Sequence, residues 1–283
     1  MSKPIIALMY DFDKTLCSKD MQEYSFIPSI GMSASDFWSE ADRIAHKSDM
    51  DKILAYMYLM IKQAKKNDVS ISRESFNNLG KDVILYKGVK SWFKRINEYG
   101  KSLGVEVEHY IISSGLKEII DGTSIAKEFK RIYACEFHYN ASGNADWPQR
   151  AVNYTTKTQY LFRISKGVLD VMDDVKLNRN IEDDDRRIPY RNMIYIGDGL
   201  TDVPCMKLVK QYGGQSIAIY QKSQKSKTEV LLKDNRVNFI CEADYSKDSE
   251  LDRIIKLIID KMATTSILAQ ISHEQREFMK DKE

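Results

Sequence analysis

The sequence predicts an α/β fold in which helices cover a parallel β-sheet. Short, continuous apolar runs alternate with segments of helical periodicity, and several of these runs end abruptly in polar or glycine-rich residues. The runs lie at 4–10, 107–112, 193–196, 216–220 and 237–241. Apolar runs of this length are typical of strands that are buried on both faces of a parallel sheet.

Apolar residues at helical spacing identify the helices between these strands. They recur at Val89, Trp92, Phe93, Ile96 and Tyr99 in one helix, and at Tyr160, Leu161, Ile164, Val168 and Leu169 in another. Residues 131–153 alternate loosely around a Ser-Gly-Asn turn and predict an irregular hairpin. After the last strand, 251–262 predict a helix, and 264–283 predict a further helix with a frayed end.

Residues 18–87, between the first and second strands, carry only helical signals. One amphipathic face contains Ala34, Phe37, Trp38, Ala41, Ile44 and Ala45, and a second contains Ile53, Leu54, Met57, Met60 and Ile61. Ser33 or Ser35 is a suitable N-cap for the first helix. We interpret the apolar faces as the core of a small helical bundle, which divides the chain into a core (1–17 and 88–283) and an insertion (18–87).

Composition excludes several classes of protein. The chain has 283 residues, of which 43% are hydrophobic, and 43 Lys+Arg against 41 Asp+Glu give a net charge of only +2. A nucleic-acid-binding protein would normally carry a basic stripe, and we expect no nucleic-acid partner. No apolar run approaches the roughly 18 residues of a membrane span. The first run is too short for a secretion signal, so we expect a cytoplasmic protein without membrane contact.

The cysteines favour neither a zinc site nor disulfides. Cys17, Cys135, Cys205 and Cys241 lie far apart, and none forms a C-x-x-C pair. A chain of this length does not need a disulfide framework to fold.

Two carboxylates, Asp11 and Asp13, follow the first predicted strand directly. Such neighbours repel each other unless a cation neutralises them, and carboxylate oxygens suit Mg²⁺, which also takes a phosphate oxygen of a substrate. A carboxylate beside the metal can attack phosphorus, while the second protonates the leaving oxygen and later deprotonates water. On its own, however, an Asp-x-Asp pair after a strand is a weak signal.

Ser113, Ser114 and Gly115 follow the next strand, where a hydroxyl and exposed backbone N–H groups could bind phosphate. The alternative is that a serine caps the helix beginning near Leu116. Lys157 lies at the start of a predicted helix, where the helix dipole disfavours a cation. A transferred phosphoryl group would explain its position, and an ordinary surface lysine is the alternative.

A tight turn, Gly197 to Asp202, follows the strand at 193–196. Glycines let the backbone approach a ligand closely, and Asp198 could complete the metal site. Asp202 could be a first-turn helix carboxylate, a partner for Lys157, or a partner for a metal-bound water. Because parallel strands bind ligands at their carboxyl ends, all these groups are expected at one edge of the sheet.

Together these motifs resemble the haloacid dehalogenase superfamily, and specifically its phosphatases that are similar to phosphoserine phosphatase. Asp11-Phe12-Asp13-Lys14-Thr15 matches the D-x-D-x-T motif, Ser113 the second-motif hydroxyl, Lys157 the third-motif lysine and Asp198-Gly199-Leu200-Thr201-Asp202 the D-G-x-x-D motif. Lys166 is a second candidate for the third-motif lysine. The resemblance implies a Rossmann-like parallel sheet core with a helical cap inserted after the first strand.

The resemblance also implies roles for these residues. Asp11 would be the nucleophile and Asp13 the acid/base, with Mg²⁺ held by Asp11, the Asp13 backbone carbonyl and Asp198. Ser113, Ser114, Gly115 and Lys157 would bind the phosphoryl oxygens, supported by Thr15 and Asp202. Asp20 occupies the position at which phosphoserine phosphatases hold the substrate amine, although here it is Asp instead of Glu and is equally consistent with an exposed carboxylate.

We therefore predict Mg²⁺-dependent hydrolysis of a small phosphorylated metabolite through an aspartyl-phosphate on Asp11. A phosphotransferase or phosphomutase using the same intermediate is one alternative, and a binding protein without catalytic activity is another. The sequence does not indicate the substrate or the oligomeric state.

Overall fold

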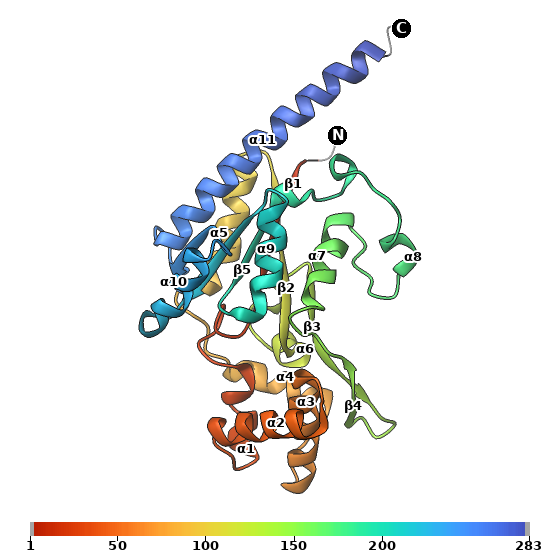
Figure 1. Ribbon diagram of the computed structural model, residues 1–283, viewed down its shortest axis with the longest axis vertical. Helices are drawn as coiled ribbons and strands as arrows, with labels where there is room; N and C mark the ends of the chain where they lie inside the picture. Colours follow the sequence, from red (N-terminus) through yellow and green to blue (C-terminus); the bar gives the residue numbers. More distant parts are fainter. Residues whose placement is uncertain (1–2, 281–283) are drawn as a thin grey trace.

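A computed structural model describes residues 3–280, apart from the side chains at 184, 227, 273 and 276–280. It contains a seven-stranded sheet in the order β4-β3-β2-β1-β5-β6-β7, parallel throughout except for the β3–β4 pair (Figure 1). The strands are β1 (Ile5–Tyr10), β2 (Glu106–Leu116), β3 (Arg131–Tyr139), β4 (Ala145–Arg150), β5 (Met193–Gly197), β6 (Gln215–Tyr220) and β7 (Phe239–Glu242). This arrangement confirms the predicted α/β fold.

Helices cover both faces of the sheet. The main ones are α5 (Val89–Ser102), α7 (Lys157–Lys166), α9 (Val203–Gln211), α10 (Lys225–Lys233) and α11 (Glu250–Lys280). The connections β1→β2 and β5→β6 run in opposite directions across the sheet, and right-handed crossovers therefore place α5 and α9 on opposite faces. α11 packs with α5, and α7 packs with α9 (Figure 1). The carboxyl end of β1 thus lies at the point where the strand order reverses, which is the usual ligand site of such sheets.

The segment between β1 and α5 is helical, as predicted. It contains α1 (Phe26–Ser29), α2 (Ala34–Ser48), α3 (Lys52–Lys66) and α4 (Arg73–Leu79), and it lies beyond the carboxyl ends of the parallel strands (Figure 1). Of the two candidate caps for α2, Ser33 is the one used, because its Oγ accepts a bond of 3.1 Å from the Asp36 N–H. Leu54 differs from the prediction, since it is 36% exposed and lies at the rim of the apolar face.

Three contacts fix the helical insertion to the rest of the chain. The two connecting segments pair through an isolated bridge between Cys17 and Leu85. The insertion also approaches the short helix α6 (Lys117–Asp121) so closely that a Cβ on Gly122 would lie 1.7 Å from the Asn77 carbonyl oxygen. A third contact joins the insertion to the β3–β4 hairpin, where the Ala145 N–H donates to the Ile71 carbonyl at 2.9 Å. The insertion therefore rests on the carboxyl edge of the sheet at several points.

Two segments differ from the sequence prediction. The hairpin predicted over 131–153 exists, but its first strand β3 also pairs in parallel with β2 and extends the main sheet. A short loose alternation cannot reveal this pairing, because it depends on a distant partner strand. The two helices predicted near the end are one continuous helix, α11, and 281–283 lie outside the described residues.

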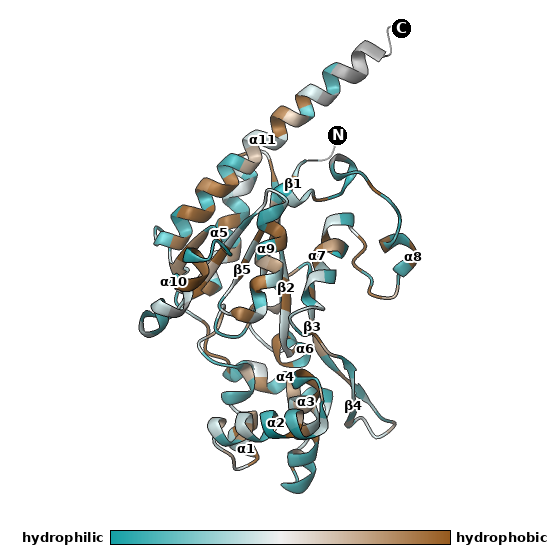
Figure 2. Cartoon of the chain, viewed as in Figure 1, coloured by the Kyte–Doolittle hydropathy of each residue, from teal (hydrophilic) through white to brown (hydrophobic). Residues whose placement is uncertain are grey.

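Apolar residues of α11 lie beside α5, and its later turns extend away from the core (Figure 2). Leu251, Ile255, Ile258, Ile259 and Met262 are buried there. Within residues 3–280, no helix combines the length and the apolar character needed to cross a membrane.

An ion pair between the buried carboxylate of Glu108 and the more exposed Arg187 fixes the long connection between α7 and β5 to the sheet. Glu108 of β2 is only 4% exposed, and its carboxylate accepts from Arg187 at 2.6 and 2.8 Å and from Tyr110. Lys130 lies 3.0 Å away. Burial opposes the charge of Glu108, but the hydrogen bonds from Arg187, Tyr110 and Lys130 outweigh it and lower its pKa to about 2.

We expect Glu108→Gln to lower the free energy of unfolding by about 2 kcal/mol at pH 7, because it removes a bidentate charged bond. The folded-state pKa of Glu108 lies below its unfolded value, so its contribution is present above about pH 4.5 and lost as the pH falls toward 2. Urea unfolding of both proteins at several pH values should show the difference narrowing over this range. A difference independent of pH would contradict the assignment.

Candidate active site

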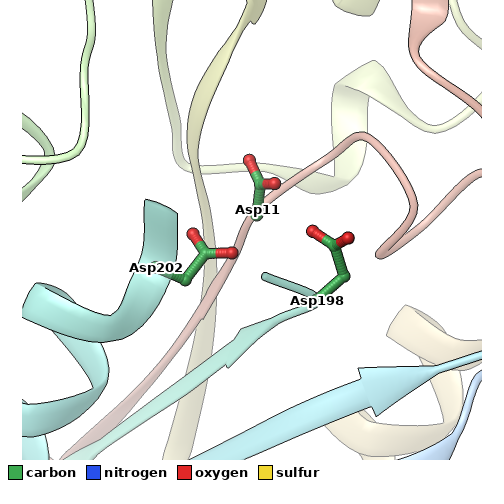
Figure 3. A group of neighbouring side chains, drawn as sticks. All are labelled: Asp11, Asp198 and Asp202. Carbon is green, nitrogen blue, oxygen red and sulfur yellow. The ribbon is translucent and has the colours of Figure 1, made fainter. Parts of the chain in front are cut away.

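Three aspartates converge at the carboxyl ends of the two central strands. Asp11 follows β1, and its backbone N–H donates to the Ile196 carbonyl of β5 at 2.9 Å. Asp198 follows β5, and Asp202 lies in the turn that leads into α9. Figure 3 shows their carboxylates facing a common space, and one oxygen from each lies within 4.8 Å of the others.

Lys157, the first residue of α7, inserts its ammonium group between two of these carboxylates. Its Nζ lies 2.7 Å from Asp202 Oδ1 and 3.0 Å from Asp11 Oδ1, and the side chain is fully buried. Burial opposes its charge, but Asp11 and Asp202 outweigh burial and raise its pKa. The negative charges of Asp11 and Asp202 therefore account for the position of Lys157 at a helix N-terminus, and no bound phosphoryl group is needed to explain it. The other candidate, Lys166, instead donates to the carbonyls of Leu177 and Arg179.

Asp202 is held as a fixed partner of Lys157. Its Oδ1 also accepts from the Tyr195 hydroxyl at 2.8 Å, and the carboxylate is completely buried. A Cβ on Gly197 would lie 2.5 Å from Asp202 Cγ, so glycine is required for this close approach. Because two donors already occupy Oδ1, Asp202 is better suited to orienting Lys157 than to binding a metal.

Asp13 lies on the side of the site that faces the insertion. Its Oδ1 accepts from the Met21 N–H at 2.8 Å. The Met21 sulfur in turn accepts from the Leu116 N–H at 3.1 Å, and a Cβ on Gly115 would lie 2.1 Å from Met21 Cε. The absence of a side chain at Gly115 therefore lets the insertion reach the site and hold Asp13.

Burial and mutual repulsion favour the neutral forms of these carboxyl groups. Burial raises the pKa of Asp11 to about 6, with Lys157 opposing the rise and Asp202 adding to it. The pKa of Asp13 is raised well above its usual range by burial and then by Asp20 and Asp11. That of Asp198 is raised by burial and then by Asp202 and Asp11. The site thus contains more negative charge than Lys157 can balance.

The donor set fits a divalent cation bound through oxygen. The three carboxylates Asp11, Asp198 and Asp202 against one ammonium leave a formal charge of −2. Asp11 and Asp198 are free to supply oxygen ligands, as small, hard cations such as Mg²⁺ require. The carboxylate of Asp13 is not part of this cluster, and the contribution of its backbone carbonyl to a metal site stays a prediction.

The predicted phosphate-binding residues lie at the end of β2, which continues to Leu116 and does not stop at Ile112 as predicted. Ser113 is buried, and its Oγ accepts from the Gly115 N–H at 3.0 Å. The Ser114 Oγ is also buried and has no hydrogen-bond partner within the described part of the chain. The helix that follows has Leu116 at its N-cap position without a side-chain bond, so neither serine acts as its cap.

Thr15 and Asp20 lie around the same loop. Thr15 is buried, and its carbonyl accepts from the Tyr245 hydroxyl at 2.8 Å. Asp20 is partly buried and pairs with Lys14 Nζ at 2.5 Å. Asp20 is therefore more than an isolated exposed carboxylate, although its role toward a substrate stays a prediction. The two arginines of the insertion do not face the site, since Arg43 pairs with Glu40 and Arg73 lies near Glu118 and Glu136.

Sequence reasoning missed several residues that build the site. Tyr195 holds Asp202, Met21 holds Asp13, and the Tyr56 hydroxyl donates to the Ser114 carbonyl at 2.8 Å. Tyr195 could have been identified from the sequence, because a tyrosine in an otherwise aliphatic buried strand needs a hydrogen-bond partner for its hydroxyl. Met21 and Tyr56 carry no such signal, since their contacts depend on how the insertion packs.

Known structures share the fold of this chain. A HAD family hydrolase of Salmonella enterica serovar Typhi superposes with a TM-score of 0.58 at 17% identity, covering 90% of this chain and 72% of that one. A substrate-bound phosphoserine phosphatase gives a TM-score of 0.55 at 13% identity, covering 90% of this chain and 99% of that one. At these identities the likeness shows a shared fold.

In sequence, the chain is 27% identical over 274 residues to an uncharacterized protein of Borreliella burgdorferi, covering 87% of this chain and 94% of that one. The haloacid dehalogenase-like hydrolase family matches residues 8–207. This range begins within β1 and contains the insertion and every site residue predicted from the sequence. The chain belongs to the haloacid dehalogenase-like hydrolase family.

Proposed function

We propose that this protein is a Mg²⁺-dependent phosphatase that hydrolyses a small phosphate monoester through an aspartyl-phosphate on Asp11. The observation that carries the proposal is the Lys157 ammonium between Asp11 and Asp202, beside the carboxylate of Asp198. Family membership and the phosphatases among its structural neighbours support a hydrolase of this type. The four cysteines are unpaired, which supports the expected cytoplasmic location.

The first chemical step assigned to these residues is attack by an Asp11 oxygen on phosphorus, which breaks the bond to the leaving oxygen. Lys157 and the hydroxyls of Ser113 and Ser114 would neutralise and orient the phosphoryl oxygens. Bound Mg²⁺ would offset the negative charges of Asp11, Asp198 and the phosphate, which otherwise repel one another.

Asp13 is assigned the proton transfers. Burial, and then Asp20 and Asp11, raise its pKa, which favours the protonated form that can donate a proton to the departing alcohol oxygen. The resulting carboxylate can then accept a proton from the water that attacks the aspartyl-phosphate, which releases inorganic phosphate and regenerates Asp11. The Met21 N–H fixes the orientation of Asp13 during both steps.

The central test is hydrolysis of an aryl phosphate by Asp11→Asn. We expect kcat to fall at least about a thousandfold, because the amide cannot form the covalent intermediate. Asp42→Asn is the matched control, since Asp42 is an exposed aspartate of α2 that pairs with Lys52. Circular dichroism checks that both variants are folded. Wild-type turnover in Asp11→Asn would exclude the proposed nucleophile.

Magnesium binding can be measured without turnover, by thermal unfolding with and without Mg²⁺. We expect Mg²⁺ to raise the Tm of the wild type, and chelator to reverse the rise. Asp198→Asn should lose this response and should unfold at a higher temperature than the wild type in the absence of metal, because it removes a partly buried carboxyl group whose charged form is disfavoured by burial and by Asp202 and Asp11.

Asp42→Asn serves as the control in the same experiment and should keep the full response to Mg²⁺. If Asp198→Asn and the wild type responded equally to Mg²⁺, the metal would have to be bound elsewhere. Manganese, which accepts similar oxygen ligands, should substitute for magnesium in this assay.

A further inference from the structure

One carboxylate of the insertion, that of Asp51, joins the insertion to the start of α7. Its Oδ1 accepts from the backbone N–H groups of Ile53 at 2.8 Å and Leu54 at 3.3 Å, and it thereby caps α3. Its Oδ2 accepts from the side-chain amide of Asn153 at 2.9 Å, although the two residues are 102 positions apart in the chain. The two oxygens of one side chain therefore bond to two different parts of the protein.

Asn153 in turn builds the turn that leads into Lys157. Its Oδ1 accepts from the N–H groups of Thr155 at 3.1 Å and Thr156 at 2.9 Å. Its carbonyl accepts from the Lys157 N–H at 2.9 Å. Thr156, at the N-cap position of α7, makes no capping bond with its own side chain. An asparagine that bonds to the backbone two and three residues further on fixes such a turn, so Asn153 holds the start of α7.

The bond between Asp51 and Asn153 requires a donor on one side and an acceptor on the other. The Asn153 Oδ1 is already occupied by the bonds from Thr155 and Thr156, so the NH₂ group of Asn153 is the one that faces Asp51. Asp51 needs an acceptor oxygen toward α3 and a second one toward Asn153. A carboxylate provides both, whereas a side-chain amide provides only one.

The helix α3 also contacts the other segment that is predicted to bind phosphate. Tyr56 of α3 donates its hydroxyl to the Ser114 carbonyl at 2.8 Å. Through Asp51 and Tyr56, α3 thus contacts the backbone segments that carry Lys157 and Ser114. Displacement of α3 would break both contacts and loosen both segments.

We infer that Asp51 is a positioning residue for phosphoryl transfer, which acts through Asn153 to fix the first turn of α7 and with it Lys157. The inference rests on the proposed function, because that function assigns Lys157 to the phosphoryl oxygens. Lys157 keeps its pairs with Asp11 and Asp202 when the bond to Asp51 is lost. The loss should therefore misplace the ammonium group slightly and reduce turnover without abolishing it.

The test exchanges the two side chains. Asp51→Asn keeps an acceptor for α3, because asparagine and aspartate are equivalent N-caps, but it turns a second NH₂ group toward Asn153. Asn153→Asp places two carboxylates opposite each other. The double variant Asp51→Asn/Asn153→Asp restores one donor and one acceptor with the direction of the bond reversed, and each helix start keeps its acceptor oxygen. Rescue in the double variant therefore isolates this one contact.

We expect each single variant to lower kcat for an aryl phosphate about tenfold, because small displacements of a positioned group are costly in catalysis. The double variant should return to within about threefold of the wild type. Hydrogen exchange followed by mass spectrometry should show faster exchange of the backbone amides at 155–160 in the single variants and wild-type exchange in the double variant.

Asp173→Asn is the matched control for both measurements. Asp173 is likewise an N-cap aspartate, and its side chain accepts from the Lys176 N–H at 3.0 Å at the start of α8 (Asp174–Leu177), in the connection between α7 and β5. Asp173→Asn should leave both kcat and the exchange at 155–160 unchanged. Circular dichroism checks that all variants are folded.

Unchanged exchange at 155–160 in both single variants, or a double variant no better than the single ones, would overturn the inference. Faster exchange combined with wild-type kcat would also overturn it, because Lys157 would then not depend on this turn. The exchange measurement needs no turnover. A wild-type protein without phosphatase activity would therefore refute the proposed function, while the exchange pattern would still decide whether Asp51 fixes α7.

Discussion

The structure of the site depends on one buried ammonium group, that of Lys157, held between Asp11 and Asp202. A charge this deep is costly unless it is paired, and breaking such a pair by removing one partner typically costs about 3–5 kcal/mol. The pairing therefore fixes three segments relative to one another: the end of β1, the start of α7 and the turn before α9. Tyr195 adds a second donor to Asp202 and makes the arrangement rigid before any ligand binds. Preorganisation of this kind is what phosphoryl transfer requires, because its catalysis depends mainly on positioning and charge.

The sheet and the residues at its edge could be predicted from the sequence because each strand and the polar residues that follow it form a local pattern. Apolar runs ending in Asp11, Ser113 or Asp198 indicate strands and their carboxyl ends, and parallel strands bring these ends together. The parts that could not be predicted depend on long-range packing. The bond from Met21 to Asp13 and the pairing of β3 with β2 join segments that show no mutual signal in one sequence. The choice of Lys157 over Lys166 was possible from helix position, but the reason for that position, a pair of carboxylates, required the structure.

The insertion lies over the carboxyl edge of the sheet, and it also holds residues of the site in place. Through Met21 it orients Asp13, and through Tyr56 it contacts the backbone of the predicted phosphate-binding segment. The bridge between Cys17 and Leu85, the close contact at Gly122 and the bond to the β3–β4 hairpin hold it in place. Movement of the insertion would thus release the proposed acid/base residue and expose the site to water in the same event.

Charge balance links the proposed metal ion to the proposed phosphate substrate. Asp11, Asp198 and Asp202 carry one negative charge each when ionised, and Lys157 offsets one of them, so a divalent cation would bring this group close to neutrality. A phosphate dianion would then be attracted by both Lys157 and the cation. Without the cation, the same dianion would meet more carboxylates than ammonium groups, so the charge balance of the cluster makes binding of a phosphate depend on a bound cation.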